Sequence, residues 1–375
     1  MEQKVLFAAS TYNYIRNYLL PHMGEFQKAG WQIHVVCGDA PGAVFYATQV
    51  ITLPLDEKIT SRINTHAARL LHRKLEQERY DLIITHSSLT SYVVRLALSG
   101  LKKRPRIINV SPGYPFDNTT GTLKRQRLLT AERRNARSVD LVLTTNQYDY
   151  RIAQRYRLGK QIINIPGIGI DFSLLKKSGR MEVHSLRQRL NLQSSHLVLL
   201  CPDDFSTRSH QSVLIRALTL LPKSAILLLT GKGPQQKECK KLAEKLGVND
   251  RIHFPDASEK MSLWYSVSNV FVTAAQGGEL SPQMLEAMYM GLPVVASAVK
   301  GHEDIILDNE TGMLFPYGNH TACADRILKL YESPILCELM GQAAHHSVLP
   351  YSLDQVLPMI TAQYGITFSD EDDNE

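Results

Sequence analysis

Residues 277–297 read GGELSPQMLEAMYMGLPVVAS, and this stretch decides the fold. Ser281 predicts the start of a helix because its hydroxyl can cap a backbone N–H, and Pro282 suits the first turn, where its missing N–H would be unpaired anyway. We expect the helix to run to about Met290 and to end at Gly291, a common residue after a helix. The apolar run that follows predicts a buried strand. Loop, helix and strand in this order indicate a parallel α/β sheet.

Two glycines precede this helix. Gly277 and Gly278 can turn the backbone tightly and let it approach a ligand closely. The helix N-terminus therefore leaves a Gly-rich loop, an arrangement that favours an anion such as a diphosphate. Glu286 lies about one turn into the helix, where its carboxylate can accept two hydrogen bonds from a ribose. The alternative is an ordinary crossover helix with a surface glutamate, because a Gly-rich loop before a helix is weak evidence by itself.

The same stretch resembles the donor-sugar motif of family 4 glycosyltransferases. The residues LEAM at 285–288 correspond to the motif's second glutamate and its neighbours, and GLPVVAS at 291–297 to the strand that follows. Further segments match the family in order along nearly the whole chain. The string IPGIGIDFSLL at 165–175 resembles the branch that makes exopolysaccharide, capsule and teichoic acid. The resemblance implies an α/β protein of the GT-B fold, with two doubly wound Rossmann-like domains facing across a cleft, and transfer of a sugar with retention.

The family places seven residues between the two glutamates of the motif. Counting back from Glu286, the expected position is Gly278, and the nearest carboxylate is Glu279, with only six residues between. We expect a re-registered loop in which Glu279 takes the first glutamate's place as a catalytic residue that contacts the donor sugar. The alternative is that this role is lost.

Other residues of the second half correspond to donor-binding positions of the family. Arg208 is expected to be catalytic, because a guanidinium can bond two oxygens of the leaving diphosphate. Asp203 stands where many relatives have a second arginine, which would remove part of the positive charge. Lys232 is either a phosphate ligand or a turn residue. The resemblance implies donor binding by Glu286, Gly278, Leu280, Ser281, Lys232, Gly231 and Pro255.

In the first half, the loop VSPGYPFDNTTGT at 110–122 carries Pro112 where relatives often have a histidine aimed at the donor sugar. A proline side chain gives no hydrogen bond, so backbone carbonyls would have to act there. Gly113 keeps the turn, and Asp117 is the only carboxylate that the sequence places nearby. The resemblance implies that the acceptor side of the cleft includes Gly113, Asp117 and Ser10.

Short apolar runs alternate with amphipathic stretches, which predicts strands that alternate with helices. Most runs are continuous, as in parallel strands that are covered on both faces. In the first half the expected strands are KVLFAAS, IHVVCG, LIITH, RIINVS, LVLTT and IINIPG. In the second half they are LVLLCP, AILLLT, RIHF, VFVTAA, PVVAS and GMLF.

Glycine and proline residues at 166–171 mark the expected domain boundary. We expect an N-terminal acceptor-side domain at 1–168 and a C-terminal nucleotide-sugar domain at 169–352. The resemblance implies that a final helix, 353–366, packs back on the first domain. Residues 367–375 are acidic and are expected to form a disordered tail.

The composition is that of a soluble globular protein, with 375 residues of which 44% are hydrophobic and 21% charged. The five cysteines are scattered without C-x-x-C spacing, which argues against a disulfide framework or a zinc site and fits a reducing cytosol. No histidine stands at metal-ligand spacing with another histidine and a carboxylate. No apolar run is long enough to span a membrane. We therefore expect a cytoplasmic protein that uses no metal or other cofactor.

The charge is unevenly distributed. Residues 1–172 carry 24 Lys and Arg against 13 Asp and Glu, a net charge of +11, whereas the remainder carries 18 against 23, a net charge of −5. One expected helix, LKRQRLLTAERRNAR at 123–137, holds the cations Lys124, Arg125, Arg127, Arg133, Arg134 and Arg137.

Apolar surface from Leu123, Leu128 and Leu129 separates these cations. Such a helix can bind an anionic membrane surface. The alternative is a solvated helix that packs on a sheet through its leucines. Nucleic-acid binding is not expected, because no known signature accompanies the charge.

The resemblance implies a retaining glycosyltransferase that moves a sugar from a nucleotide diphosphate donor, expected to be a UDP-sugar, to an acceptor hydroxyl. The resemblance to polysaccharide enzymes implies a lipid-linked saccharide acceptor at the inner face of the membrane, where the protein would bind peripherally. Closure about the domain boundary would bring acceptor and donor together. A catalytically silent GT-B subunit that binds a partner or a glycan is the first alternative. Another GT-B enzyme, such as a nucleotide-sugar epimerase, is the second.

Overall fold

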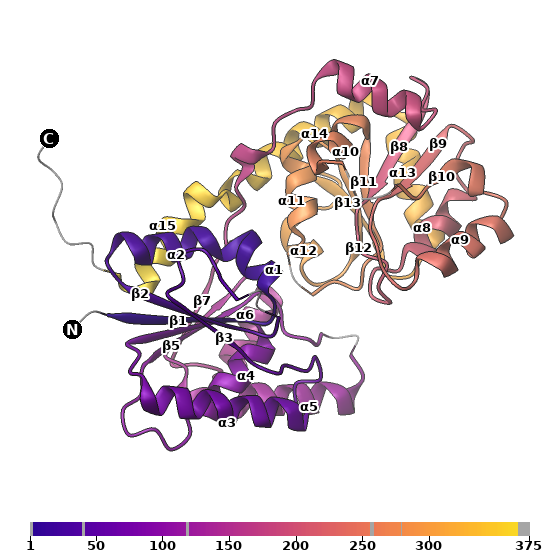
Figure 1. The fold of residues 1–375 in the computed structure, drawn as a ribbon. Coiled ribbons are helices and arrows are strands. Elements are labelled where there is room, and N and C mark those ends of the chain that lie inside the picture. The colour runs from indigo at the N-terminus through magenta and orange to yellow at the C-terminus, as the bar shows by residue number, and fades with distance from the viewer. Residues whose placement is uncertain (1–2, 40–41, 118–119, 256–258, 279, 367–375) are drawn as a thin grey trace, which may run out of the picture. The chain divides into compact units, whose positions relative to one another are not determined.

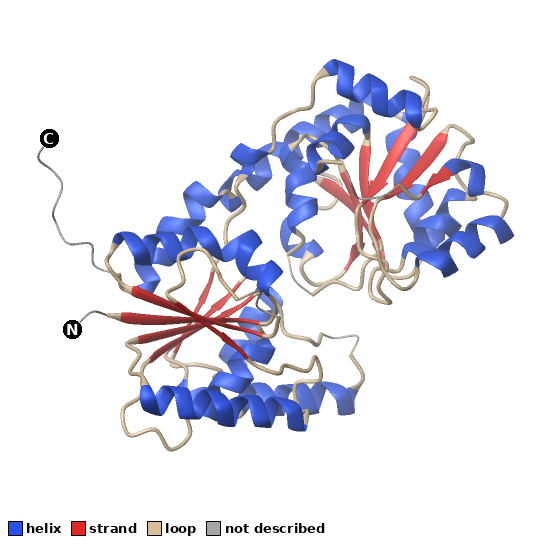
Figure 2. Cartoon of the chain, viewed as in Figure 1, coloured by secondary structure: helices blue, strands red, loops and turns tan. Residues whose placement is uncertain are grey.

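The computed structural model describes residues 3–39, 42–117, 120–255, 259–278 and 280–366. The chain forms two compact units (Figure 1, Figure 2). Unit 1 comprises Met1–Gly169 and Leu353–Glu375, and unit 2 comprises Ile170–Ser352. Each unit has its own sheet and its own core.

Unit 1 is built on a seven-stranded parallel sheet in the order β3-β2-β1-β4-β5-β6-β7. Its central strands are buried along almost their whole length, which explains their continuous apolar sequences. The strands are β1 Lys4–Ala9, β2 Gln32–Cys37, β3 Gln49–Thr52, β4 Leu82–His86, β5 Arg106–Ser111, β6 Leu141–Thr144 and β7 Gln161–Asn164.

Helices cover both faces of this sheet (Figure 2). One face packs against α3 Arg62–Gln77, α4 Ser88–Ala97, α5 Thr122–Arg133 and α6 Gln147–Tyr156. The other face packs against the π-helical turn η1 Ile15–Leu19, α2 Leu20–Lys28 and α15 Leu353–Tyr364. Two short helices, α1 Tyr12–Tyr14 and η2 Ala136–Ser138, complete the unit.

Unit 2 contains a six-stranded parallel sheet in the order β10-β9-β8-β11-β12-β13. The strands are β8 Leu197–Cys201, β9 Ala225–Leu229, β10 Ile252–His253, β11 Val270–Thr273, β12 Val294–Ala298 and β13 Gly312–Pro316. This is the strand order of a nucleotide-binding Rossmann sheet.

The helices of unit 2 also lie on both faces of its sheet. One face packs against α8 Gln211–Leu218, α9 Gln236–Lys245 and α13 His320–Glu332. The other packs against α7 Arg180–Arg189, α10 Met261–Val267, α11 Pro282–Tyr289, α12 His302–Ile305 and α14 Pro334–Val348. The short helices are η3 Phe172–Leu174, η4 Asn249–Arg251 and η5 Leu349–Tyr351.

The expectation of two doubly wound α/β domains is therefore confirmed. The predicted helix at 281–290 also forms as expected: Ser281 caps it, Pro282 opens it, and Gly291 follows it with φ of +83°. The apolar runs do not predict β3, because this short edge strand is half-buried to exposed and carries no strong apolar signal.

The basic helix ends earlier than predicted. α5 stops at Arg133, the next residue is extended, and Asn135 adopts the left-handed conformation with φ of +56°. Asparagine tolerates this conformation, and its Nδ2 donates a hydrogen bond to the carbonyl of Arg95 at 3.1 Å. The prediction that Arg134 and Arg137 lie on the same helix as the other cations is therefore wrong.

Helix α15 belongs to the core of unit 1, although about 180 residues of sequence separate it from the rest of that unit. Its buried side chains Val356, Ile360 and Tyr364 pack in the same cluster as α2 and the sheet. Arg106 of β5 fixes the end of the helix by donating to the carbonyl of Tyr364 at 2.7 Å.

The chain passes between the units twice, after Gly169 and after Ser352. Gly169 has φ of +86°, and a Cβ there would lie 2.9 Å from the Cα of Leu353. A glycine is therefore required where the outgoing and returning segments meet.

In both sheets the strand order reverses beside the first strand of the unit. The reversal falls between β1 and β4 in unit 1 and between β8 and β11 in unit 2. Loops that leave such neighbouring strands diverge, and open α/β sheets bind their ligands at this point, outside the carboxyl ends of the strands. Ser10 and Ser87 follow the two strands in unit 1, and Arg208 and Gly277 follow those in unit 2.

Candidate nucleotide-sugar site

Arg208 and the Gly277–Gly278 turn meet at the reversal point of unit 2. The loop that carries Arg208 follows β8, and the glycine turn follows β11, the neighbouring strand. The guanidinium Nη2 of Arg208 donates to the carbonyl of Gly277 at 2.9 Å, and the N–H of Gln276 donates to the carbonyl of Arg208 at 2.8 Å. These two bonds hold a cation beside the turn that precedes α11.

Both positions of this turn require glycine. Gly277 has φ of +44°, and a Cβ there would lie 2.5 Å from the carbonyl oxygen of Lys300. Gly278 has φ of +150°, and a Cβ there would lie 2.8 Å from Nη2 of Arg208. The second glycine therefore leaves room for the guanidinium.

Two backbone amides near the start of α11 are bonded within the protein. The N–H of Gly278 donates to the carbonyl of Lys300 at 3.1 Å, and the N–H of Met284 donates to the hydroxyl of Ser281 at 3.2 Å. These bonds stabilise the turn and the start of the helix, so these two amides are not offered to an anion. Arg208 places a cation at this end of the helix.

Glu286 points toward α10, where the hydroxyl of Tyr265 donates to its Oε2 at 2.8 Å. Burial raises the pKa of the Glu286 carboxyl above its ordinary value, and the bond from Tyr265 opposes this shift. The side chain is half-buried, so the carboxylate is positioned by one partner and retains capacity to accept further hydrogen bonds.

The Asp203 carboxylate is bonded to the neighbouring strand. Its Oδ2 accepts a hydrogen bond from the hydroxyl of Thr273 at 2.6 Å, so the carboxylate links the ends of β8 and β11. Burial raises the pKa of Asp203, and the bond from Thr273 opposes the rise. The residue that replaces the family's second arginine therefore serves to join two strands.

The Gly231–Lys232 turn packs against the same β8 loop. A Cβ at Gly231 would collide with the backbone carbonyl of Asp203, and the carbonyl of Lys232 accepts the N–H of Phe205 at 3.1 Å. The Lys232 side chain is exposed. The close approach of two protein loops thus explains the glycine without a ligand.

Three donor candidates remain, and none of them has a described contact with Arg208 or Glu286. Pro255 is half-buried after β10, next to Phe254, whose ring lies 6.1 Å from that of Phe205. Leu280 packs against the apolar core under α11. Glu279 lies outside the described residues.

Lys300 is a residue of this site that the motif does not reveal. It is the second residue after β12, the neighbour of β11, and only 7% of it is exposed. Its carbonyl accepts the N–H of Gly278. A lysine is seldom buried unless its charge is used. The signal in the sequence is positional: the carboxyl ends of parallel strands meet at one edge, so the two residues after PVVASA, Val299 and Lys300, lie beside the glycine turn.

Two family models match the chain. The model "Glycosyl transferase 4-like domain" matches residues 15–163, in unit 1, and the model "Glycosyl transferases group 1" matches residues 183–347, in unit 2, including Arg208, Gly277, Glu286 and Lys300. The chain belongs to the GT-B glycosyltransferases. It is 26% identical to the candidate glycosyltransferase EpsD of Bacillus subtilis (strain 168) over 359 residues, which cover 94% of this chain and 93% of EpsD.

Solved structures share the fold of this glycosyltransferase. Sucrose-phosphate synthase of Thermosynechococcus elongatus superposes with a TM-score of 0.81 at 19% identity, covering 97% of this chain and 98% of the other. HepE of Anabaena, solved with UDP and glucose, superposes with a TM-score of 0.78 at 18% identity, covering 97% of this chain and 100% of the other.

The predicted acceptor residues of this glycosyltransferase lie at the reversal point of unit 1 or in the loop after β5. The hydroxyls of Ser10 and Ser87 are 2.9 Å apart, and Gly113 follows β5. Asp117 accepts from the N–H of Thr120 at 3.0 Å and so stabilises its own loop.

Asp117 is not the only carboxylate near this loop, which corrects the sequence-based expectation. The buried Asp149 of α6 accepts the N–H of Tyr114 at 2.8 Å. Asp149 also accepts a bond from Nδ2 of Asn146 and donates its own N–H to that residue's Oδ1, each at 2.8 Å, as part of the cap of α6. Its pairing with Tyr114 joins segments 35 residues apart and cannot be read from local sequence.

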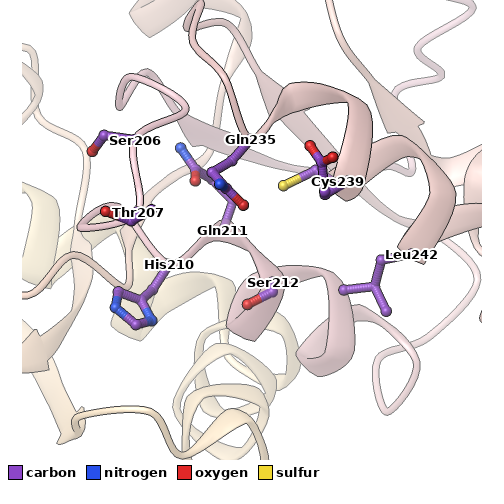
Figure 3. A pocket seen from close by; sticks show the side chains of 9 residues that line it. Ser206, Thr207, His210, Gln211, Ser212, Gln235, Cys239 and Leu242 are labelled. Atoms are coloured by element: carbon purple, nitrogen blue, oxygen red, sulfur yellow. The ribbon is translucent and has the colours of Figure 1, made fainter.

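A pocket of about 290 Å³ lies beside the Arg208 loop in unit 2. Figure 3 shows Thr207 and His210 on one side of it and Cys239 and Leu242 on the other. Arg208 and Glu286 do not line it, and Glu238 does. The pocket is therefore not the diphosphate site.

In the part of the chain that the structure describes, no three side chains of His, Cys, Asp or Glu gather as a metal site would require. None of the described helices has the length and apolar character needed to cross a bilayer.

Proposed function

We propose that this glycosyltransferase moves a sugar, with retention of configuration, from a UDP-sugar to a lipid-linked or polysaccharide-precursor acceptor. One observation carries the proposal: the Arg208 guanidinium is fixed beside the glycine turn at the strand reversal of unit 2, ahead of the helix that bears Glu286. A cation at this point can bind the diphosphate, and a carboxylate one turn into the helix can bind the ribose.

The chemistry follows from these groups. Negative charge grows on the leaving diphosphate as the bond to the sugar breaks, and Arg208 stabilises it. Glu286 orients the nucleotide, and Glu279 contacts the donor sugar. Because the protein supplies the cation, the reaction needs no metal. Ser10, Gly113 and Asp117 belong to the acceptor side, on unit 1.

The known proteins support the finer assignments. HepE has been solved with UDP and glucose, which favours a UDP-sugar as donor. A similar fold is found in WaaG, a glycosyltransferase involved in lipopolysaccharide biosynthesis, at a TM-score of 0.74 and 17% identity, which favours an acceptor in envelope polysaccharide synthesis.

A panel of nucleoside diphosphate sugars tests the proposal. A donor present at about 100 times its dissociation constant should stabilise the protein by about 2.7 kcal/mol. Transfer or slow hydrolysis of that donor should continue with EDTA present, and NMR of the product should show the anomeric configuration of the donor. An inverted product would contradict retention, and loss of activity with EDTA would contradict the metal-free reaction.

Replacing Glu286 by glutamine should weaken UDP binding while the fold is kept. The loss of a charge-assisted hydrogen bond costs about 1.5–3 kcal/mol, which is roughly a tenfold to hundredfold rise in Kd. Calorimetric titration of UDP into both proteins measures this. Glu303→Gln, which removes an exposed carboxylate from α12, should leave the Kd unchanged.

The pH dependence of the same titration provides a second readout. Because burial raises the pKa of Glu286, its carboxylate protonates at a higher pH than an exposed one would. UDP affinity should therefore fall as the pH is lowered. The midpoint of this fall should lie at a pH above about 4.5, the ordinary pKa of this group. Glu286→Gln should lack this component. Equal Kd values for both proteins at every pH would remove Glu286 from the ribose site.

The basic helix α5 supports peripheral membrane binding. Lys124 and Arg127 of the helix and Arg134 directly after it are exposed, and Leu123 is 74% exposed. Leu128 and Leu129 are half-buried against the core of unit 1, so they attach the helix to its own domain. A buried ion pair between Arg95 and Glu132, at 3.2 Å, adds to this attachment and leaves the cationic face outward.

Replacing Lys124, Arg127 and Arg134 by glutamine should release the protein from anionic vesicles. Each cation near such a surface contributes about 1 kcal/mol. Flotation with phosphatidylglycerol vesicles should show binding that rises with acidic lipid and falls with salt. Arg133 is left in place because its guanidinium stacks on the ring of Tyr156.

The matched control removes the same charge from another helix. Arg62, Arg69 and Arg73 of α3 are exposed, and their replacement by glutamine should reduce vesicle binding much less. If the two triple variants lose binding equally, net charge rather than α5 is responsible, and the proposal fails.

A further inference from the structure

Helix α7 of unit 2 turns a cationic face toward a cavity. Arg180, Val183, His184 and Arg187 line a recess of about 450 Å³. Their spacing of three, four and seven residues places them on one side of the helix. In Figure 1, α7 lies next to α10. Tyr265 and Ser266 of α10 also line the recess.

The recess is positively charged. Its lining includes Lys177, Arg180 and Arg187, together with His184, and no carboxylate. Within the residues that the structure describes, no ion pair joins these cations to an acidic side chain. Cations gathered in a concave site without a counter-charge attract anions strongly.

One of these cations is fixed in place. Arg187 donates from Nη1 to the carbonyl of Val267 at 3.2 Å and from Nη2 to the carbonyl of Gln193 at 2.6 Å. Lys177 and Arg180 are exposed at the edge of the recess. The hydroxyls of Ser266 and Ser268 donate to the carbonyls of Ser262 at 2.7 Å and Trp264 at 2.8 Å, so the donors of the lining are its cations. A fixed guanidinium and two further cations suit a phosphate group better than a carboxylate, because phosphate offers more acceptor oxygens.

Tyr265 connects this recess to the nucleotide-sugar site. Its side chain lines the recess, and its hydroxyl lies 2.8 Å from Oε2 of Glu286 and 3.2 Å from the carbonyl oxygen of Gln283, so its one hydrogen is shared between these acceptors. A ligand that moves the Tyr265 ring therefore moves the hydrogen-bond donor of the predicted ribose ligand.

We propose that the recess under α7 binds a phosphate-bearing ligand, and that its occupancy changes nucleotide affinity through Tyr265. The coupling rests on the proposed function, whereas the phosphate site does not. Binding at the two sites is reciprocal, so each ligand changes the affinity of the other by the same factor.

Titration with inorganic phosphate at constant ionic strength tests the site. All proteins carry Arg208→Ala, which removes the phosphate-binding cation of the donor site. Adding Lys177→Gln and Arg180→Gln should weaken phosphate binding about tenfold or more. The control pair Lys176→Gln and Lys223→Gln removes two exposed cations outside the recess and should leave binding unchanged. Equal affinity in the two double variants overturns the site.

The coupling is measured with Arg208 present. Phosphate competes with UDP at the donor site in every protein, so the comparison is between the unmodified protein and the Lys177→Gln/Arg180→Gln variant. The effect of phosphate on UDP affinity should differ about threefold or more between them. Tyr265→Phe should abolish the difference. An identical effect in both overturns the coupling, and absence of UDP binding overturns the proposed function while the phosphate titration still decides the site.

Vesicles distinguish a lipid headgroup from a free phosphate compound. In the background of the triple variant at Lys124, Arg127 and Arg134, phosphatidylglycerol vesicles should retain the protein through the recess if the ligand is a headgroup, and Lys177→Gln/Arg180→Gln should release it. Phosphate binding without vesicle binding identifies a free phosphate compound.

Discussion

Replacing Arg208 by alanine is expected to lower the maximal rate of sugar transfer by about a hundredfold to a thousandfold, the range seen when a positioned transition-state donor is lost. The effect should fall on kcat more than on KM, because the charge that Arg208 neutralises grows as the diphosphate leaves. Steady-state kinetics with the donor identified in the nucleotide-sugar panel measures both constants.

Two further variants separate the cation from its structural bond. Arg208→Lys keeps the charge but not the planar fork that bonds the Gly277 carbonyl, and it should recover part of the rate. Arg216→Ala, which removes an exposed arginine from α8, should match the unmodified protein. A variant that loses donor affinity and keeps its full rate would show that Arg208 acts only in binding.

Replacing Glu279 by alanine should reduce transfer by about a hundredfold, as expected when a hydrogen-bonding group close to the reacting carbon is removed. The expectation rests on the spacing of Glu279 to Glu286 and on Gly278 at the family's usual position. Initial rates under single-turnover conditions measure the loss directly. Glu244→Ala, on the exposed side of α9, is the matched control and should transfer normally.

The silent-subunit hypothesis makes the opposite prediction for the same variant. In that case the pure protein binds UDP but neither transfers nor hydrolyses a donor sugar, with or without Glu279. A donor complex in which the Glu279 carboxylate lies far from the sugar would support that hypothesis. Transfer that is unaffected by Glu279→Ala would instead assign the sugar contact to another residue, with Lys300 the first to examine.

Much of the fold could be predicted because its signals are local. Continuous apolar runs gave all the strands of the unit 2 sheet, and Ser281, Pro282 and Gly291 gave the bounds of α11. Where local signals were weak, prediction failed. β3 is an edge strand with little buried surface, and the end of α5 depends on a left-handed asparagine bonded to α4.

The candidate site residues came from the resemblance, but their contacts did not. Gly278 and Glu286 lie in the motif and Arg208 lies outside it, and the contacts of all three depend on partners distant in sequence. Tyr265 orients Glu286 from another helix, and Lys300 meets the glycine turn from the next strand. Such contacts depend on the order of the strands in the sheet. A single sequence does not specify which distant residues that order brings together.

The place of α15 in unit 1 has a consequence for biosynthesis. Multidomain chains usually fold their N-terminal domain first, as it leaves the ribosome. Here the cluster that contains Phe7 and Phe26 is completed by Val356, Ile360 and Tyr364, which are made only after all of unit 2. At about 5–20 residues per second, the delay is roughly 10 to 40 seconds. During that interval unit 2 can close its own core, while the apolar groove for α15 stays open on the nascent chain and is a natural binding surface for a chaperone.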